Sequence, residues 1–394
     1  MLESAEAARR LGVKVTTLYA YVSRGLLASH RSPDSRRSLF AVDDVEHLAR
    51  RARSGREVET RLATVTTGVT QIRDDGPAYR GVPAVDLAAT ASFEAVAERL
   101  WASGPLAFDA PAMGRVPALA ARDRMRWAVV IAGARDPVRS DLRPEAVWRA
   151  GARIVASAVA VLGPDRSPPM PPRSMADEPR RPDWLAGRLA GHLVPSASAD
   201  AVRAVNAALV LLADHELATS TVAVRVAAST RADPYDAVLA GLGTIGGPLH
   251  AGASRLVHDL LADAAERGPE PALDDALRFS GHAPGFGHTL YPGGDPRATR
   301  LAELSRRAGE ARARRVVDGV VDAAARQGLP LPNIDLALGS LGWTLGATGD
   351  FGETVFTVAR MAGWVAHYVE ELAEPPLRFR ARAVYARTAA DPPR

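Results

Sequence analysis

The spacing of apolar residues constrains the fold of this chain more than any other feature. Apolar residues recur every three or four positions through 124–132, 147–161 and 201–212, which is the period of an amphipathic helix. No internal repeat and no alternation of strand and helix patterns accompanies them. Residues 163–182 interrupt the pattern with seven prolines, too many for a helix or a central strand, so a surface loop is expected there. The sequence therefore predicts a mainly α-helical body.

Length and composition indicate an ordinary globular protein. The chain has 394 residues, of which 47% are hydrophobic and 24% charged, enough for two or three domains with a sizeable core. Cysteine is absent, which excludes disulfides, cysteine metal sites and a cysteine nucleophile. The first residues lack the basic and apolar regions of a secretory signal, and no apolar run of about 18 residues is present. We therefore expect a cytoplasmic protein without a membrane span.

The charge is concentrated at the N-terminus. Residues 1–56 contain eleven Lys and Arg against six Asp and Glu, whereas the whole chain has a net charge of only +4. A basic segment on a nearly neutral body is typical of an appended module that meets polyanions.

The N-terminal segment has the pattern of a small helical module. We predict helices over 4–11 and from residue 15, a wing over 26–40, and a third helix beginning near Asp43. The sequence Ala-Ala-Arg-Arg-Leu-Gly-Val-Lys-Val-Thr-Thr-Leu at 7–18 resembles the winged helix-turn-helix of the MerR and excisionase group.

In that group the second helix enters the major groove and arginines of the wing contact phosphates. The resemblance therefore implies that DNA is a partner of residues 1–53. The residues expected at DNA are Thr16, Thr17, Tyr19 and Arg24 on the helix side, and Arg31, Arg36 and Arg37 on the backbone side. The alternative is a helical module that docks on its own protein or fixes the geometry of an oligomer.

Four short stretches in the C-terminal half place acid–base or cationic residues in glycine-rich or helical frames. They are 246–253 with His250, 285–291 with His288, 295–298 with Arg297, and 333–335 with Asp335. Two histidines and a carboxylate can enolise one carbonyl compound and add it to another, and an arginine can hold a substrate carboxylate.

These four stretches, in this order, resemble citrate synthase, and the resemblance extends over about 65–390. It implies a mainly α fold with large and small helical domains that close over the substrates and form sites in a homodimer or a higher even oligomer. The expected domains are 1–53 winged helix-turn-helix, 54–64 linker, 65–262 large domain, 263–355 small domain, and 356–394 return to the large domain.

The resemblance also assigns roles in the condensation of acetyl-CoA with oxaloacetate to citrate and CoA. Asp335 is expected to be the base, His250 to stabilise the enol, and His288 to polarise the carbonyl of the oxo acid. Arg297, Arg360 and Arg380 are expected to bind its carboxylates, the last across the dimer, and His215 to complete this site. Acetyl-CoA or propionyl-CoA is then the co-substrate, with no bound cofactor and no metal site.

Two histidines and one glycine motif have simpler interpretations. His367 stands at a spacing that buries it, so we interpret it as structural, and His282 lies beside the loop of His288. The stretch 241–246 matches the dinucleotide fingerprint literally, but a helical pattern precedes it instead of a strand, so nucleotide binding is not expected.

Several positions depart from the family pattern. Thr289 stands where the family usually has arginine, Ala218 where asparagine is usual, and Ala251 and Ser254 replace a glycine and an asparagine. The loop before Asp295 is altered at 292–294. The alternatives to a citrate synthase are therefore a 2-methylcitrate synthase acting on propionyl-CoA, and a transcriptional regulator that uses a citrate synthase-like body as its metabolite sensor.

Overall fold

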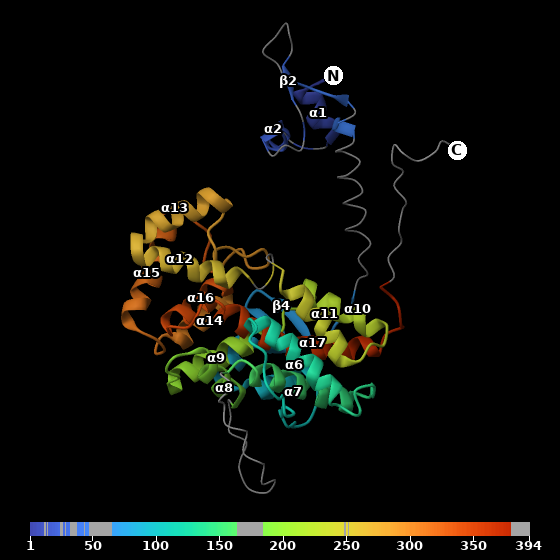
Figure 1. Ribbon diagram of the computed structural model, residues 1–394. Coiled ribbons are helices and arrows are strands. Elements are labelled where there is room, and N and C mark those ends of the chain that lie inside the picture. Colours follow the sequence, from blue (N-terminus) through green and yellow to red (C-terminus); the bar gives the residue numbers. More distant parts are fainter. Residues whose placement is uncertain are drawn as a thin grey trace, which may run out of the picture. The chain divides into compact units, whose positions relative to one another are not determined.

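Helices form most of the described chain, in agreement with the apolar periodicity (Figure 1). The computed structural model describes residues 1–11, 13, 15–23, 27, 29–31, 38–42, 44–46, 65–163, 184–247, 250 and 252–379. The chain divides into two compact units, residues 1–66 and 67–394. The proline-rich stretch and the predicted 54–64 linker lie outside the described residues, apart from Gly163.

The first unit combines two helices with a small sheet. Its elements are β1 (Leu2–Glu3), α1 (Ser4–Leu11), α2 (Val15–Ser23), β2 (His30–Arg31) and β3 (Ser38–Phe40). The strand β3 pairs antiparallel with β1 and β2, in the order β1-β3-β2. Leu18 and Phe40 are fully buried in its core. The two predicted helices and the paired strands of the wing are present, and most of the third helix falls outside the described residues.

The second unit opens with a hairpin and continues in helices. The strands are β4 (Thr70–Arg73), β5 (Gly76–Tyr79) and β6 (Val82–Pro83). Arg80 and Gly81 both have positive φ between β5 and β6, so the tight turn uses a glycine where the left-handed conformation is easiest. The first group of helices is α4 (Ala84–Thr90), α5 (Phe93–Trp101), α6 (Ala121–Ala134), α7 (Pro144–Ala160), α8 (Trp184–Leu193), α9 (Ala199–Leu212), α10 (Thr219–Ser229) and α11 (Pro234–Ile245).

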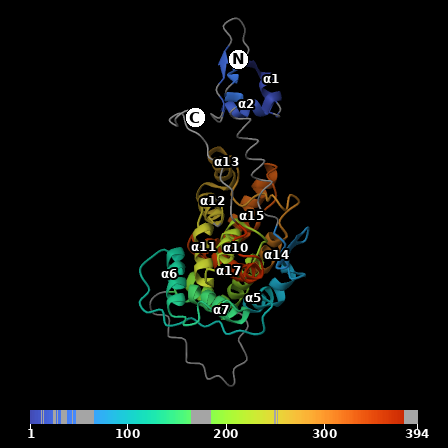
Figure 2. The ribbon, with the colours of Figure 1, turned by 90° about the vertical axis from the view of Figure 1, so that its right-hand side faces the viewer.

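The remaining helices complete the body. They are α12 (Ala253–Arg267), α13 (Pro269–Ser280), α14 (Pro296–Ser305), α15 (Ala311–Arg326), α16 (Ile334–Thr344) and α17 (Phe351–Leu372). The 22-residue helix α17 packs against α5, α7, α9, α10 and α11, and Figure 2 shows it among α5, α7, α10 and α11. Side chains all around α17 are buried, as expected for a helix at the centre of a core.

Two hydrophobic cores divide this unit. The larger core joins α4–α11 and α17, and the smaller core joins α12, α13 and α15, with α16 contributing to both. Leu301 of α14 belongs to the larger core, and residue 262 lies within α12. The boundaries 65–262, 263–355 and 356–394 remain predictions.

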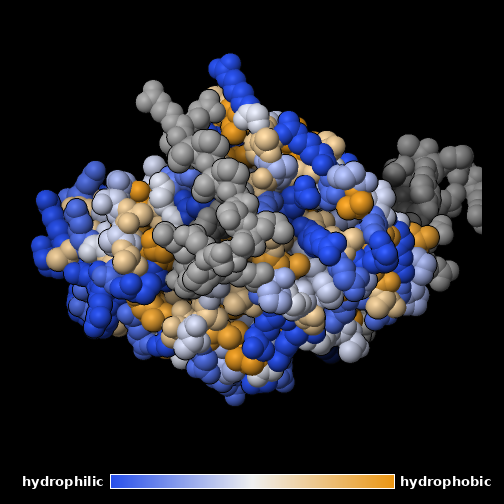
Figure 3. All heavy atoms as spheres, turned by 90° about the horizontal axis from the view of Figure 1, so that it is seen from below, coloured by the Kyte–Doolittle hydropathy of each residue, from blue (hydrophilic) through white to orange (hydrophobic). Residues whose placement is uncertain are grey.

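The face of the molecule that is seen from below Figure 1 carries both polar and apolar side chains. Figure 3 shows a surface that is largely hydrophilic, with hydrophobic side chains scattered over it. Within the described residues, no helix is long and apolar enough to cross a membrane.

The glycines of the dinucleotide-like stretch lie in helix α11 and at its end, not in a phosphate-binding loop. Asp233 caps α11 by accepting from the backbone N–H groups of Tyr235 and Asp236. A methyl group at Gly241 would lie 2.9 Å from the Trp364 ring and from Val224. The glycine there serves close helix packing.

A matched pair of substitutions on α11 tests this packing. Gly241→Ala overpacks the contact with Trp364 and is expected to lower the free energy of unfolding by about 1–3 kcal/mol. Gly243→Ala, on the same helix with no atom within 4 Å of the new methyl group, is expected to be neutral or to stabilise by up to about 1 kcal/mol. Urea unfolding measures both, and equal effects would contradict the packing role of Gly241.

Candidate active site

The loop that carries His288 is joined to the segment that begins α16. Gly285 and Gly287 both have positive φ, and a methyl group at Gly285 would lie 2.9 Å from Cα of Leu336. Asn333 N–H donates to the Gly285 carbonyl (2.9 Å) and Asn333 Nδ2 donates to the Gly287 carbonyl (2.8 Å). The two predicted motifs, 285–291 and 333–335, are therefore one structural unit.

The protonation state of His288 follows from its contacts. The backbone N–H of Leu290 points at Nδ1 at 3.1 Å, and Arg297 Nη2 points at Nε2 at 3.3 Å. A neutral imidazole has one acceptor nitrogen, so only one of these two hydrogen bonds can form. Burial and then the Arg297 guanidinium lower the pKa of His288. The ring is thus a neutral imidazole, and in the tautomer that accepts from Leu290 its proton is on Nε2, where it can be donated to a ligand.

Arg297 is fixed by a carboxylate next to it in sequence. Asp295 caps α14 and accepts from Arg297 Nε (3.0 Å) and Nη2 (2.8 Å). The same carboxylate accepts from the backbone N–H of Ile334 at 3.0 Å. Both Asp295 and Arg297 are buried. Asp295 therefore ties the N-terminus of α14 to that of α16.

His215 lies beside His288 and Tyr291. Its Nε2 is 3.2 Å from the Tyr291 hydroxyl, and its ring centroid is 5.8 Å from that of His288. Burial, followed by the charges of Arg297 and Arg360, holds the pKa of His215 far below its usual range. His215 is therefore neutral.

Arg360 is a buried cation of a different kind. It is 1% exposed, its Nε donates to the Leu212 carbonyl at 3.1 Å, and its guanidinium stacks on the Phe356 ring. Among the described residues, no carboxylate lies within ion-pair distance of it. A buried guanidinium without a carboxylate in direct contact is costly, and an anionic ligand would add to the attraction of the more distant Asp214 carboxylate.

His250 is held by a serine that the sequence analysis did not single out. The indole N–H of Trp364 donates to Ser220 Oγ (3.3 Å), and Ser220 Oγ lies 3.0 Å from His250 Nε2. Because the indole can only donate, the serine hydroxyl can still donate to Nε2, and in that arrangement the ring proton is on Nδ1. Burial and Arg360 lower the pKa of His250 to about 4.

Asp335 stands in the first turn of α16, whose N-cap is Asn333. Burial raises the pKa of Asp335 to about 6, although Arg297 acts in the opposite direction. Among the described residues, none donates a hydrogen bond to its carboxylate. Asp335 is thus ionised at neutral pH and has the elevated basicity of a general base.

The predicted residues gather in one region. His215, His288 and Arg297 are in contact, and the Arg360 charge acts on His215. Arg360 also acts on the charge of His250, and Arg297 and Asp295 act on that of Asp335. No ion-pair contact within 4.0 Å links His250 to Asp335. Arg380 lies outside the described residues.

The residues predicted to contact DNA belong to the first unit. Thr16, Thr17 and Tyr19 lie on α2 and Arg31 ends β2, whereas Arg24, Arg36 and Arg37 lie outside the described residues. In the part of the chain that is described, no group of three or more His, Asp or Glu residues could hold a metal ion.

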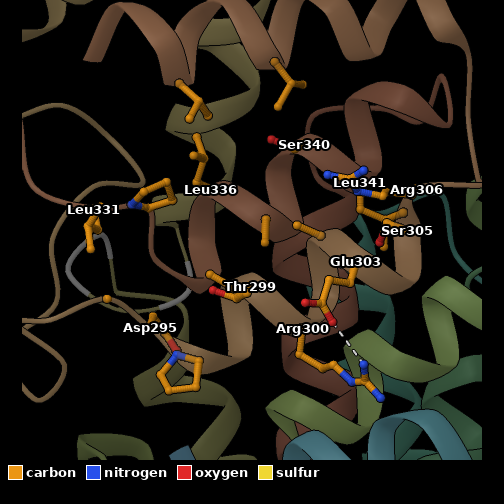
Figure 4. Close-up of a pocket in the computed structure, with 18 of the residues that line it drawn as sticks. Asp295, Thr299, Arg300, Glu303, Ser305, Arg306, Leu331, Leu336, Ser340 and Leu341 are labelled. Atoms are coloured by element: carbon orange, nitrogen blue, oxygen red, sulfur yellow. Dashed lines mark hydrogen bonds and ion pairs between the residues drawn. The ribbon is translucent and has the colours of Figure 1, made fainter. Parts of the chain in front are cut away.

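A cavity of about 1370 Å³ lies next to the cluster between α14, α15 and α16. Figure 4 shows Asp295 at one end and the Arg300–Glu303 ion pair at the other. None of the predicted catalytic histidines lines it, and neither does Asp335. The cavity is therefore separate from the chemical groups.

Comparison with known proteins identifies the family. Residues 109–382 match the profile described as citrate synthase, C-terminal domain. The chain belongs to the citrate synthase family. Residues 1–53 match a helix-turn-helix domain. The predictions of a mainly α-helical citrate synthase-type enzyme with an N-terminal helix-turn-helix domain are confirmed.

One curated relative in the citrate synthase family aligns with most of the chain, and another aligns with less than half of it. Citrate synthase 2 of Bacillus subtilis is 32% identical over 357 residues, which are 82% of this chain and 94% of that protein. 2-Methylcitrate synthase 1 of Corynebacterium glutamicum is 36% identical over 183 residues, 44% of this chain and 47% of that protein.

Solved structures of the family share the fold. Citrate synthase of Thermoplasma acidophilum, solved as a ternary complex with carboxymethyl coenzyme A and oxaloacetate, superposes with a TM-score of 0.67 at 22% identity, covering 84% of this chain and 96% of that one. Citrate synthase of Thermotoga maritima gives a TM-score of 0.64 at 21% identity with the same coverage.

Proposed function

We propose that this enzyme condenses acetyl-CoA with oxaloacetate to give citrate and CoA. The observation that carries the proposal is Arg360, a buried guanidinium with no carboxylate within ion-pair distance among the described residues, near the neutral His215 and His250. A small dianion supplies the missing negative charge. Arg297 and Arg360 would grip its carboxylates through charge-assisted hydrogen bonds, and Arg380 of a second copy would add a third contact in a homodimer.

Different residues would act on the two substrates: Asp335 and His250 on the thioester, and His288 on oxaloacetate. Asp335 would take a proton from the methyl group of the thioester, while the Nδ1–H of His250 hydrogen-bonds the thioester oxygen and stabilises the enol. The enol carbon would then attack the carbonyl of oxaloacetate. The Nε2–H of His288 would polarise that carbonyl and give its proton to the new alkoxide. Water would finally hydrolyse the citryl thioester and release CoA.

Neutral histidines suit both tasks. A neutral imidazole with a fixed tautomer presents one N–H to an oxygen on which negative charge develops. A hydrogen bond from Ser220 would hold His250 with its proton on Nδ1, and one from Leu290 would hold His288 with its proton on Nε2. Closure of the smaller core over the larger one would exclude water from the enol.

The test is release of free thiol by the purified protein. With oxaloacetate and acetyl-CoA we expect turnover that falls about 10²- to 10⁴-fold in Asp335→Asn, because the amide cannot accept the methyl proton. Asp275→Asn removes a half-buried carboxylate of α13 that pairs with Arg267 and Arg278, outside the cluster, and is expected to leave the rate unchanged. Faster turnover with propionyl-CoA would make the enzyme a 2-methylcitrate synthase, and no turnover with either thioester would contradict the proposal.

The dependence of the rate on pH tests the state of Asp335 separately. The ionised carboxylate is the active form and its pKa is about 6, so kcat should be level near pH 8. Below pH 6 it should fall by about tenfold per pH unit, since protonation removes the base. The residual rate of Asp335→Asn should lack this acid limb. A profile that stays level down to pH 4.5 would contradict the assignment.

The helix-turn-helix domain supports DNA binding as a second function. Residues 1–53 match that family and contain ten Lys and Arg against six Asp and Glu, a net charge of +4. The body would then both catalyse and sense its substrates, or act as a sensor alone. The alternative remains a module that docks on the body.

Salt dependence distinguishes DNA binding from docking. The full chain should bind a fragment from upstream of its own gene with an affinity that falls linearly in log–log form with salt. Arg36→Ala with Arg37→Ala should reduce that slope by about two, whereas Arg278→Ala on α13 should not change it. Fluorescence anisotropy measures both, and a lack of binding to any fragment at 50 mM salt would contradict this function.

A further inference from the structure

Four ionisable side chains outside the proposed reaction form a fully buried chain. Asp214, Arg225, His367 and Glu371 are each 0% exposed. Burying this many polar groups is costly unless each one is paired. The spacing of His367 in the sequence predicts a structural residue. Its contacts with Arg225 and Asp214 indicate a more specific role.

The hydrogen bonds of His367 have only one possible direction. Arg225 Nη1 donates to His367 Nδ1 at 2.9 Å, and a guanidinium has no acceptor. Nδ1 is therefore unprotonated, and the ring proton is on Nε2. That atom is 3.2 Å from Asp214 Oδ2, so His367 donates to the aspartate.

Asp214 in turn holds the backbone on both sides of His215. Its Oδ2 accepts from the backbone N–H of Glu216 at 3.2 Å, which bridges across residue 215. Glu216 has a φ of +56°, a conformation that a non-glycine residue adopts at a cost. The hydrogen bond from Asp214 stabilises this turn and thereby sets the direction of the His215 side chain.

We propose that His367 is a positioning residue for the oxo acid site, acting through Asp214 on His215. This inference rests on the proposed function, because His215 is there a ligand of the oxo acid. A purely structural His367 would affect stability alone, whereas a positioning His367 affects the affinity for oxaloacetate and the environment of the His215 ring.

The other end of the chain of contacts reaches the C-terminal segment. Arg225 Nε donates to Glu371 Oε2 (2.9 Å) and Arg378 Nε donates to Glu371 Oε1 (2.6 Å). Arg378 precedes by two residues Arg380, the predicted third carboxylate ligand. The same contacts thus extend from the turn of His215 to Arg378.

Two substitutions of His367 separate the hypotheses. The amide nitrogen of Gln reaches the position of Nε2 and keeps a donor toward Asp214, whereas that of Asn reaches only the position of Nδ1. His367→Asn should weaken oxaloacetate binding about tenfold or more, because the hydrogen bond to a buried carboxylate is lost. The KM for acetyl-CoA should change little, and His367→Gln should restore most of the affinity.

Tyr368→Phe is the matched control on the same helix. It removes a buried hydrogen bond, from the tyrosine hydroxyl to the Ala232 carbonyl at 2.7 Å, that does not lead to Asp214. It should lower the melting temperature by an amount comparable to His367→Asn and leave oxaloacetate binding unchanged. Equal oxaloacetate affinities in His367→Asn and Tyr368→Phe would overturn the proposal.

A readout without turnover keeps this test separate from the proposed function. In ¹⁵N-histidine spectra, assigned with a His215→Gln variant, His215 should titrate far below its usual range in the wild type. It should shift toward the usual range in His367→Asn alone. An unchanged His215 would overturn the positioning role, whereas a shift in protein that lacks condensing activity would leave it standing and sink the proposed function.

Discussion

The geometry of the candidate active site depends on the hydrogen bonds that the carboxylate of Asp295 accepts. This carboxylate accepts hydrogen bonds from the side chain and the backbone of Arg297, and from the backbone of Ile334. One buried anion therefore caps α14, neutralises a buried cation and fixes the start of α16, on which Asp335 stands. A buried ion pair stabilises a fold little by itself, but here it sets the relative position of a substrate ligand and the base.

Helix α17 positions the residues at the other side of the site, around His215. Arg360 donates to the Leu212 carbonyl, and the backbone N–H of Gly363 donates to the Ala213 carbonyl at 3.0 Å. His367 contacts Asp214. Three positions spaced by three or four residues thus hold the end of α9 and the turn that carries His215. The spacing is that of one helix face, which explains how a single central helix supplies both the cation and the support for a histidine.

The local features of this site could be predicted from the sequence because their signals are local. Glycines with positive φ in 285–287, the Asp295-Pro296 start of α14 and the Asn333 cap of α16 each depend on a few adjacent residues. The contacts between Ser220 and His250, and between His367 and Asp214, join residues 30 and 153 positions apart. Periodicity predicts that such side chains are buried but does not predict which polar groups meet.

The protonation states connect these supports to the proposed reaction. His215, His250 and His288 all have lowered pKa values, and the nearby arginine charges contribute to each shift. The arginines that would bind a dianion therefore also keep the histidines neutral before it arrives. Binding of the dianion would offset that positive charge and raise the pKa values of the histidines, which makes it easier for His288 to take up a proton again after it has given one to the alkoxide. Thr289, where the family usually has arginine, removes one cation from this balance, so that Arg297 and Arg360 carry more of it.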